Sequence, residues 1–219
     1  MIVDLNLKGK DVVVFGGGRE AGRKVDSLLS QNCRITVIAE DIGDEICRWA
    51  GEGKVHLQYQ SVENGDCLKQ FANLILMIAA TDDQALNRKL VLAAKAMRCY
   101  AYAVDDPDFS DFSHPAVINI RDTVQIAVST GGRSPLAAGK IRERIEPVLK
   151  NMIHEEDILR IRLQEKMRQA AKSRFPLSES RKQFLFNVFH DEGINRLLAE
   201  GNLGEAERVA MKQLESFRA

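Results

Sequence analysis

The 219-residue sequence lacks the features that mark several classes of protein. No apolar run approaches the ~18 residues that a membrane-spanning helix needs, and the first residues, which already include Asp4, lack the apolar stretch of a secretory signal. Neither charge is in excess, because 31 Lys and Arg balance 31 Asp and Glu, whereas a duplex-binding protein usually carries a basic excess. We therefore expect a cytoplasmic protein that binds neither membranes nor nucleic acids.

Cysteine is scarce, and the four cysteines are far apart in the sequence. They form no CxxC pair, so their spacing predicts neither a zinc site nor a redox motif. In a chain of this size such cysteines are typical of reduced, mostly buried thiols. We therefore predict no bound metal. The cysteines are Cys33, Cys47, Cys67 and Cys99.

The charge balance is a sum of unlike parts. Residues 1–132 hold 14 basic and 18 acidic residues, a net charge of −4, whereas residues 133–182 hold 13 basic and 7 acidic residues, a net charge of +6. The remaining residues hold 4 basic and 6 acidic residues, a net charge of −2. A cationic middle segment therefore follows an acidic first half, which suits an anionic ligand.

Strand and helix patterns alternate over the first half of the chain. Short β-branched or apolar runs are typical of strands buried on both faces, and amphipathic stretches separate them. Such alternation predicts an α/β fold with a Rossmann-like, doubly wound parallel sheet. The predicted strands are residues 11–15, 34–38, 55–59, 74–80 and 99–104, and the predicted helices are residues 20–31, 42–50 and 82–97, the last capped by Thr81 or Asp82.

The alternation stops after residue 104. Residues 116–120 and 124–129 flank a short turn and predict an antiparallel hairpin. From Pro135 onward the pattern is helical, with a predicted end or kink near Pro147 and a helix cap at Ser178. We divide the chain into a nucleotide-binding domain, a dimerisation and substrate-cleft segment, and a small α-helical domain: residues 1–112, 113–150 and 151–219.

A glycine-rich turn follows the first predicted strand and opens a helix. Gly16-Gly17-Gly18-Arg19-Glu20-Ala21 fits the G-x-G-x-x-G/A pattern, in which Gly16 allows a tight turn and Gly18 lets a pyrophosphate approach the backbone. Glu40 lies 22 residues after Gly18, at the end of the second strand, with Asp41 beside it. A carboxylate there binds ribose hydroxyls and repels a 2′-phosphate, which favours NAD over NADP. The alternative is a structural turn without a ligand.

Two further groups of residues follow predicted strands. Thr81 and Asp82 end the fourth strand at the edge where such sheets bind ligands, although they could act only as helix caps. Asp105 follows the fifth strand, where a carboxylate could act as general base. Its neighbours are rivals for that role, or all are solvated loop acids. These rivals are Asp106, Asp108 and Asp111.

Four segments together resemble one known family. They are residues 14–24 with the glycine turn, Ala79-Ala80-Thr81-Asp82-Asp83, Val104-Asp105-Asp106-Pro107, and Ser129-Thr130-Gly131-Gly132-Arg133-Ser134-Pro135. Their order and intervals are similar to those of the precorrin-2 dehydrogenase/sirohydrochlorin ferrochelatase (siroheme synthase) family. The resemblance covers about residues 1–150, and the last segment is its most specific part. The sequence differs from the family pattern at Glu20, usually Val, and at Tyr102, often Asn.

The resemblance implies an NAD-dependent oxidation of precorrin-2 to sirohydrochlorin by an intertwined homodimer. It implies that Asp105 is the essential acid. It also implies that Arg19, Glu20, Glu40 and Asp41 contact NAD and that residues 129–134 line the tetrapyrrole cleft. With the residues argued above, the predicted cofactor site is Gly16, Gly18, Arg19, Glu20, Glu40, Asp41, Thr81 and Asp82, and the predicted substrate site is Ser129, Thr130, Gly131, Gly132, Arg133, Ser134 and His114.

The substrate chemistry fits the residues of the cationic segment. A tetrapyrrole with eight carboxylates needs positive charge, hydroxyls and exposed amides, which residues 129–134 and the basic residues after them supply. Pairs such as Arg142 with Glu146 could instead belong to a solvated helix, and His114 could be structural rather than an acid–base group. Iron insertion, with Fe²⁺ as a second substrate, stays open. The alternative function is a non-catalytic, NAD-sensing dimer.

Overall fold

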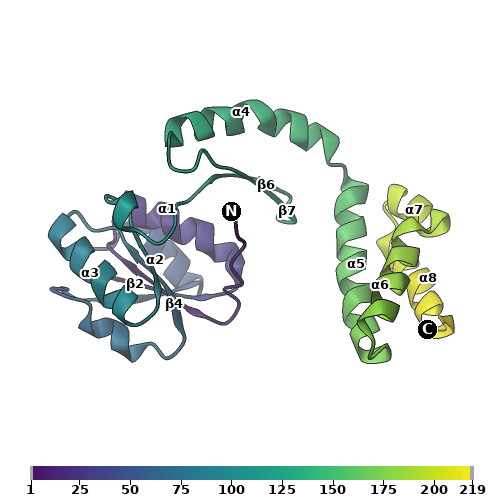
Figure 1. Ribbon diagram of the computed structural model, residues 1–219, viewed down its shortest axis with the longest axis horizontal. Helices are drawn as coiled ribbons and strands as arrows, with labels where there is room; N and C mark the ends of the chain where they lie inside the picture. The colour runs from purple at the N-terminus through teal and green to yellow at the C-terminus, as the bar shows by residue number, and fades with distance from the viewer. Residues whose placement is uncertain (1, 218–219) are drawn as a thin grey trace. The chain divides into compact units, whose positions relative to one another are not determined.

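The computed structural model describes residues 2–217. Within them the chain forms two compact units, which we describe separately (Figure 1). The first unit consists of the residues up to Pro115 together with Gly131–Arg133. The second consists of Ala116–Thr130 and the residues from Ser134 onward. The three-part division drawn from the sequence stays a prediction.

A five-stranded parallel sheet forms the centre of the first unit. The strand order is β3-β2-β1-β4-β5, so the order reverses between β1 and β4. Open parallel sheets of this kind bind ligands at that reversal, outside the carboxyl ends of the strands. The predicted Rossmann-like sheet is therefore confirmed. The strands are β1 (Asp11–Phe15), β2 (Arg34–Ala39), β3 (Val55–Tyr59), β4 (Leu74–Ala79) and β5 (Tyr100–Ala103).

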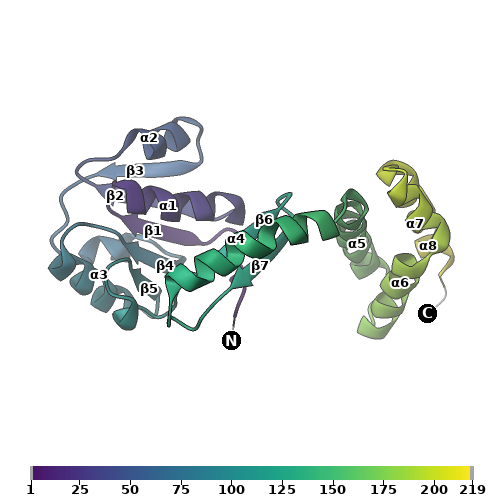
Figure 2. The same cartoon turned by 90° about the horizontal axis from the view of Figure 1, so that it is seen from above.

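Helices cover both faces of this sheet, because alternate strand residues point to opposite faces (Figure 2). Val12 and Val14 pack with α1 (Arg19–Leu28) and α2 (Asp44–Gly51) in one core cluster. Val13 and Phe15 pack with α3 (Gln84–Ala96) in another. The sheet is thus buried on both faces, as its continuous apolar strands predict. Short 3-10 helices, η1 (Leu29–Gln31), η2 (Asp66–Gln70) and η3 (Pro107–Phe109), complete the unit.

The start of α3 differs from the sequence prediction. The N-cap is Asp83, whose carboxylate accepts a hydrogen bond from the Leu86 amide at 3.0 Å. Neither Thr81 nor Asp82 caps the helix, so that prediction was wrong. Thr81 is occupied otherwise, because its hydroxyl donates to the Asn87 side chain at 2.6 Å.

A hairpin opens the second unit. Strands β6 (Ala116–Ile120) and β7 (Val124–Val128) pair antiparallel, as predicted, with Ile118 opposite Ile126. Arg121 and Asp122 in the turn have φ values of 51° and 50°, and positive φ at both central residues matches the right-handed twist of hairpin strands. Side-chain bonds fix the turn, because Asn119 donates to the Asp122 carboxylate at 2.7 Å.

The following helix does not end at its proline. Helix α4 (Pro135–Met152) begins after the N-cap Ser134 and continues through Pro147. Pro147 therefore does not end the helix near Glu146, and the alternative of a kink there stays a prediction. An internal proline removes one helical hydrogen bond, which a helix of 18 residues tolerates. The break comes instead at His154, where the Asp157 carboxylate accepts a bond from the His154 amide at 2.9 Å.

Four helices form a separate core in the second unit. They are α5 (Glu155–Arg174), α6 (Ser178–His190), α7 (Glu192–Ala199) and α8 (Leu203–Ser216). Ser178 is the first helical residue of α6 rather than its cap, because the N-cap is Leu177. The rings of Phe175, Phe184 and Phe217 contact one another with centroids 5.4–6.0 Å apart. Between residues 2 and 217, no helix is both long and apolar enough to cross a membrane.

We predict that Phe184→Ala destabilises the second unit by about 3–5 kcal/mol, because the ring is buried and its removal leaves a cavity. Urea unfolding followed by circular dichroism measures this change. Phe186→Ala on the same helix is the matched control, because that side chain is exposed. Equal losses in the two variants would contradict the position of the core.

Candidate functional site

A cavity of about 930 Å³ opens at the carboxyl edge of the sheet, beside β1, β2 and β4. Four chain segments surround it: the glycine turn, the loop after β2, the loop after β3 and the loop after β4. The third of these was missed in the sequence, because Gln60, Ser61 and Val62 belong to no motif. The structure thus brings every predicted cofactor residue to one cavity. These residues are Gly16, Gly18, Arg19, Glu20, Glu40, Asp41, Thr81 and Asp82.

The three positions of the turn require glycine for different structural reasons. Gly16 has a φ of 107°, and a Cβ there would lie 2.3 Å from the Ala80 carbonyl oxygen. A Cβ on Gly17 would lie 2.0 Å from the Asp41 carbonyl oxygen. Gly18 has nothing within 4 Å of such a position. The first two glycines therefore let the chain segments meet, and the third leaves open space where a ligand can approach the backbone.

The start of α1 suits a phosphate. Gly18 is the N-cap and has no side chain to satisfy the first amides of the helix, which carry the positive end of the helix dipole. Glu20, the departure from the family pattern, is neutralised locally because Arg23 Nη1 lies 2.7 Å from its carboxylate. Arg19 Nε lies 3.9 Å from the same carboxylate, and its side chain is largely exposed. A basic residue thus remains beside the expected phosphate position.

Carboxylates follow β2 and line the same cavity. Glu40 and Asp41 begin the loop that leads to α2, and the Gly43 amide fastens this loop by donating to the Gly17 carbonyl at 2.9 Å. Open amides for a diphosphate and carboxylates for ribose hydroxyls therefore face one space whose size suits a dinucleotide. The residues present fit NAD(P).

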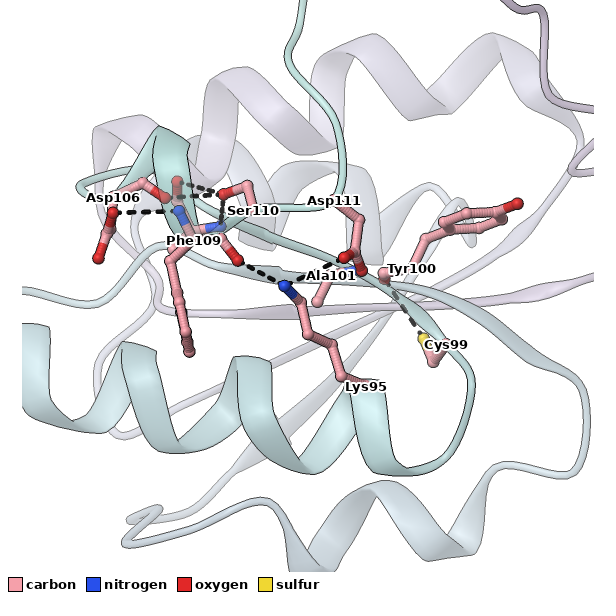
Figure 3. Close-up of polar contacts among 9 residues, drawn as sticks. Lys95, Cys99, Tyr100, Ala101, Asp106, Phe109, Ser110 and Asp111 are labelled. Atoms are coloured by element: carbon pink, nitrogen blue, oxygen red, sulfur yellow. Dashed lines mark hydrogen bonds and ion pairs between the residues drawn. The ribbon is translucent and has the colours of Figure 1, made fainter.

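Hydrogen bonds divide the acidic residues after β5 into two groups. The Asp106 carboxylate caps η3 by accepting from the Phe109 amide at 3.2 Å. Asp111 accepts from the Ala101 amide at 2.9 Å and from Lys95 at 3.1 Å (Figure 3). Asp108 lies exposed in η3. Two of the three rivals of Asp105 thus hold the loop together.

Asp105 has a different partner. Its Oδ1 accepts a hydrogen bond from Asn87 Nδ2 at 2.9 Å, and both residues line a small hollow of about 100 Å³. Asn87 is buried and also bonds Thr81, so it connects the dinucleotide cavity to the Asp105 carboxylate. Sequence reasoning missed Asn87. The available signal was a polar residue on the same helical face as the buried Leu90 and Ala94.

His114 packs against two aromatic rings in the first unit. Its ring centroid lies 4.6 Å from that of Tyr102 and 5.3 Å from that of Phe112. Desolvation by this packing, with the Lys24 ammonium nearby, lowers the pKa of His114 from its usual value. Lys24 also lies over the Tyr102 ring, 4.7 Å from its centroid. His114 is therefore a neutral imidazole at pH 7.

The predicted substrate segment connects β7 to α4. Gly131 and Gly132 have φ values of 62° and 79°, a conformation that favours glycine. Thr130 Oγ1 accepts from the Ser134 amide at 3.0 Å, and Ser134 Oγ caps α4 by accepting from the Ala137 amide at 3.1 Å. The turn is therefore built by its own hydroxyls. Ser129 and Arg133 complete the predicted set in this segment.

The basic residues of α4 are largely paired within the helix. Arg142 Nη1 lies 2.7 Å from the Glu146 carboxylate, as the spacing predicts, and Lys150 lies 2.7 Å from its other oxygen. Lys140 pairs with Glu143 at 2.9 Å.

All four cysteines are free thiols. Residues 2–217 contain no cluster of three or more His, Cys, Asp or Glu side chains that could hold a metal ion.

Comparison with protein families finds two matches. Residues 3–116 match the model described as "Putative NAD(P)-binding". Residues 121–146 match the model of the sirohaem biosynthesis protein central domain. The first match covers the sheet and the cavity described above, and the second covers the region from the hairpin turn into α4.

Curated relatives and a solved structure extend these matches. Over 97% of its length, the chain is 32% identical to a siroheme synthase of Actinobacillus pleuropneumoniae serotype 3 (strain JL03), of which it spans 42%. It is 33% identical over 97% of its length to that of Methylococcus capsulatus (strain ATCC 33009 / NCIMB 11132 / Bath), of which it spans 43%. The chain thus spans less than half the length of these relatives.

The solved structure of SirC, a precorrin-2 dehydrogenase, has a similar fold. The TM-score is 0.63 at 24% identity, over 99% of this chain and 100% of the other. At this identity the likeness concerns the fold, and the family matches confirm the resemblance noted in the sequence motifs. The chain belongs to the NAD(P)-binding family that makes up the N-terminal part of siroheme synthases, joined here to the central sirohaem-biosynthesis segment.

Proposed function

We propose that this protein oxidises precorrin-2 to sirohydrochlorin with NAD as the hydride acceptor. The observation that carries the proposal is the Asp105 carboxylate, which the Thr81–Asn87 hydrogen bonds connect to a cavity suited to a dinucleotide. Among the acids that follow β5, Asp106 and Asp111 are engaged in holding the loop. Similarity to SirC, a precorrin-2 dehydrogenase, and to the siroheme synthase relatives supports the same reaction.

The chemistry requires the loss of one hydride and one proton from neighbouring atoms of the substrate. When bound, NAD accepts the hydride. Asp105 accepts the proton, since a positioned carboxylate can act as general base. The amides at the start of α1 and the carboxylates of Glu40 and Asp41 bind and orient the cofactor in the cavity.

A polycarboxylated tetrapyrrole needs hydrogen-bond donors and positive charge in its site. On the family resemblance, we assign residues 129–134 to the binding of its acetate and propionate side chains, with Arg133 as the basic residue of the segment. His114, neutral at pH 7, offers a ring nitrogen as a further hydrogen-bond partner. We also propose a homodimer, on the family resemblance. For iron insertion, residues 2–217 show no cluster of side chains that could hold a metal ion.

Glu40 should select NAD over NADP. A carboxylate at the end of β2 accepts hydrogen bonds from the ribose hydroxyls and repels a 2′-phosphate. We predict that Glu40→Ser reduces the preference for NAD by at least about tenfold, which corresponds to ~1.4 kcal/mol. Calorimetric titration with both cofactors measures it. Asp44→Ser is the control, an exposed acid at the start of α2, and equal shifts in both variants would contradict the role of Glu40.

The test of the proposed function is spectroscopic. The protein is mixed anaerobically with NAD⁺ and enzymatically generated precorrin-2, and the absorption of sirohydrochlorin and of NADH is recorded. We expect both to appear in equal amounts. NAD⁺ binding without any turnover would refute the dehydrogenase and support the NAD-sensing alternative. A second arm adds Fe²⁺ to sirohydrochlorin with and without the protein, and equal rates would exclude iron insertion.

A further inference from the structure

Asn87 occupies an unusual position for a polar side chain. It lies in the first turns of α3, on the helical face that packs against the sheet, and only 1% of its surface is exposed. Among residues 2–217, the one other buried polar side chain is Thr36 in β2. A buried amide costs free energy unless its hydrogen bonds are made. Its partners therefore indicate why it is there.

The Asn87 amide uses its full hydrogen-bonding capacity. Its Oδ1 accepts from the Thr81 amide at 3.2 Å and from the Thr81 hydroxyl at 2.6 Å. Its Nδ2 donates to the Thr81 carbonyl at 3.0 Å and to Asp105 Oδ1 at 2.9 Å. An amide has two donors and two acceptor lone pairs, so all four are occupied.

These partners also fix the orientation of the amide. If the oxygen and nitrogen of Asn87 were exchanged, the oxygen would face the Asp105 carboxylate and the Thr81 carbonyl, both of which are acceptors. The Nδ2 donor therefore points to Asp105 in a single arrangement. Because Thr81 lines the dinucleotide cavity, the same amide joins the end of β4 to the acid that follows β5.

We infer that Asn87 is a positioning residue, which holds the Asp105 carboxylate in the orientation needed for proton abstraction. The same amide fixes the position of Asp105 relative to Thr81, which lines the dinucleotide cavity at the end of β4. This inference rests on the proposed function. Asn87 does not touch the reacting atoms, and it acts through Asp105. Misplacement of a reacting group by ~1 Å can cost about a hundredfold in rate, so the effect of removing the amide belongs in kcat rather than in substrate affinity.

A double-mutant cycle separates positioning from a general structural effect. We expect Asn87→Ala to lower kcat by about 10- to 100-fold while KM for precorrin-2 changes by less than about threefold. In an Asp105→Asn background the same change should cost less than about threefold, because the group that Asn87 positions is already inactive. Equal losses in both backgrounds would overturn the inference. Thr36→Val is the matched control, a buried polar residue in β2, and should leave kcat unchanged.

A second variant keeps the shape of the side chain. Asn87→Asp retains the acceptor for the Thr81 amide but places a carboxylate oxygen against Asp105. Two carboxylates at that separation share a proton, so we expect the acid side of the pH–rate profile to move to higher pH and the rate to recover as the pH rises. An unchanged profile would overturn the inference, because it would show that the side chain at position 87 does not act on the group that titrates in the reaction.

A readout without turnover distinguishes the failure of this inference from the failure of the proposed function. If the wild-type protein binds NAD⁺ but oxidises no precorrin-2, the proposed function fails. Crystal structures of the wild type and Asn87→Leu then decide the positioning role. A displaced or disordered Asp105 carboxylate in Asn87→Leu supports it, and an unchanged carboxylate overturns it.

Discussion

Replacing Asp105 with Asn should lower kcat by about 10²- to 10⁴-fold, the usual contribution of a general base. The amide keeps the size of the carboxylate and an acceptor for Asn87 Nδ2, so we expect the fold to survive. NAD⁺ affinity should change by less than about threefold, because Asp105 lies outside the residues that line the dinucleotide cavity. Stopped-flow measurement of NADH formation and calorimetric titration with NAD⁺ check the two expectations.

Asp108→Asn is the matched control for this prediction. Asp108 lies three residues further along the same acidic loop, in η3, and is exposed. We expect its kcat to stay within about twofold of the wild type. A large loss of kcat in Asp108→Asn together with a small loss in Asp105→Asn would indicate that Asp108 accepts the proton and would refute the assignment to Asp105.

The glycine turn gives the second large effect. A substitution at Gly17 should lower the stability of the protein, whereas one at Gly18 should lower its affinity for NAD⁺. Gly17→Ala should destabilise the first unit by several kcal/mol, because the added Cβ would lie 2.0 Å from the Asp41 carbonyl oxygen and 2.7 Å from the Ile42 Cα. Both are backbone atoms that cannot rotate away. Thermal unfolding followed by circular dichroism measures the loss, which is of the size expected from overpacking.

Gly18→Ala should instead give a stable protein that binds NAD⁺ poorly. A Cβ at Gly18 meets nothing within 4 Å in the protein, so the melting temperature should stay near that of the wild type. The same methyl group occupies the space through which a diphosphate approaches the first amides of α1. We expect at least about a tenfold rise in the Kd for NAD⁺. Wild-type affinity in this variant would mean that the diphosphate does not bind at this turn.

Local pattern predicted the sheet well, because β-branched and apolar runs are bounded by turn residues. The runs at Asp11–Phe15 and Val55–Tyr59 were predicted with their observed limits. The helix boundaries were less certain for a physical reason. Thr81, Asp82 and Asp83 are all good capping residues, and the choice of Asp83 depends on Thr81 being bound to Asn87. Pro147 breaks one hydrogen bond, and the rest of α4 outweighs that loss.

The site was predictable where a motif carries it and unpredictable where tertiary contacts create it. The glycine turn and Glu40 belong to one recognisable pattern. The position of Asn87 on the buried face of a helix was readable from the sequence, but its partner was not, because Asp105 lies 18 residues away on another element. The departure from the family pattern at Glu20 is accommodated by its pairing with Arg23 on the next turn of α1. The roles of the site residues stay predictions.

Helix α3 holds both ends of the acidic loop. Asn87 in its first turns bonds Asp105, and Lys95 in its last turn bonds the Phe109 carbonyl at 2.7 Å and Asp111 at 3.1 Å (Figure 3). The loop is therefore ordered before any ligand arrives. We therefore expect that no binding energy is needed to position the Asp105 carboxylate, that cofactor and substrate can arrive in either order as far as this loop is concerned, and that no closing lid is required to complete it.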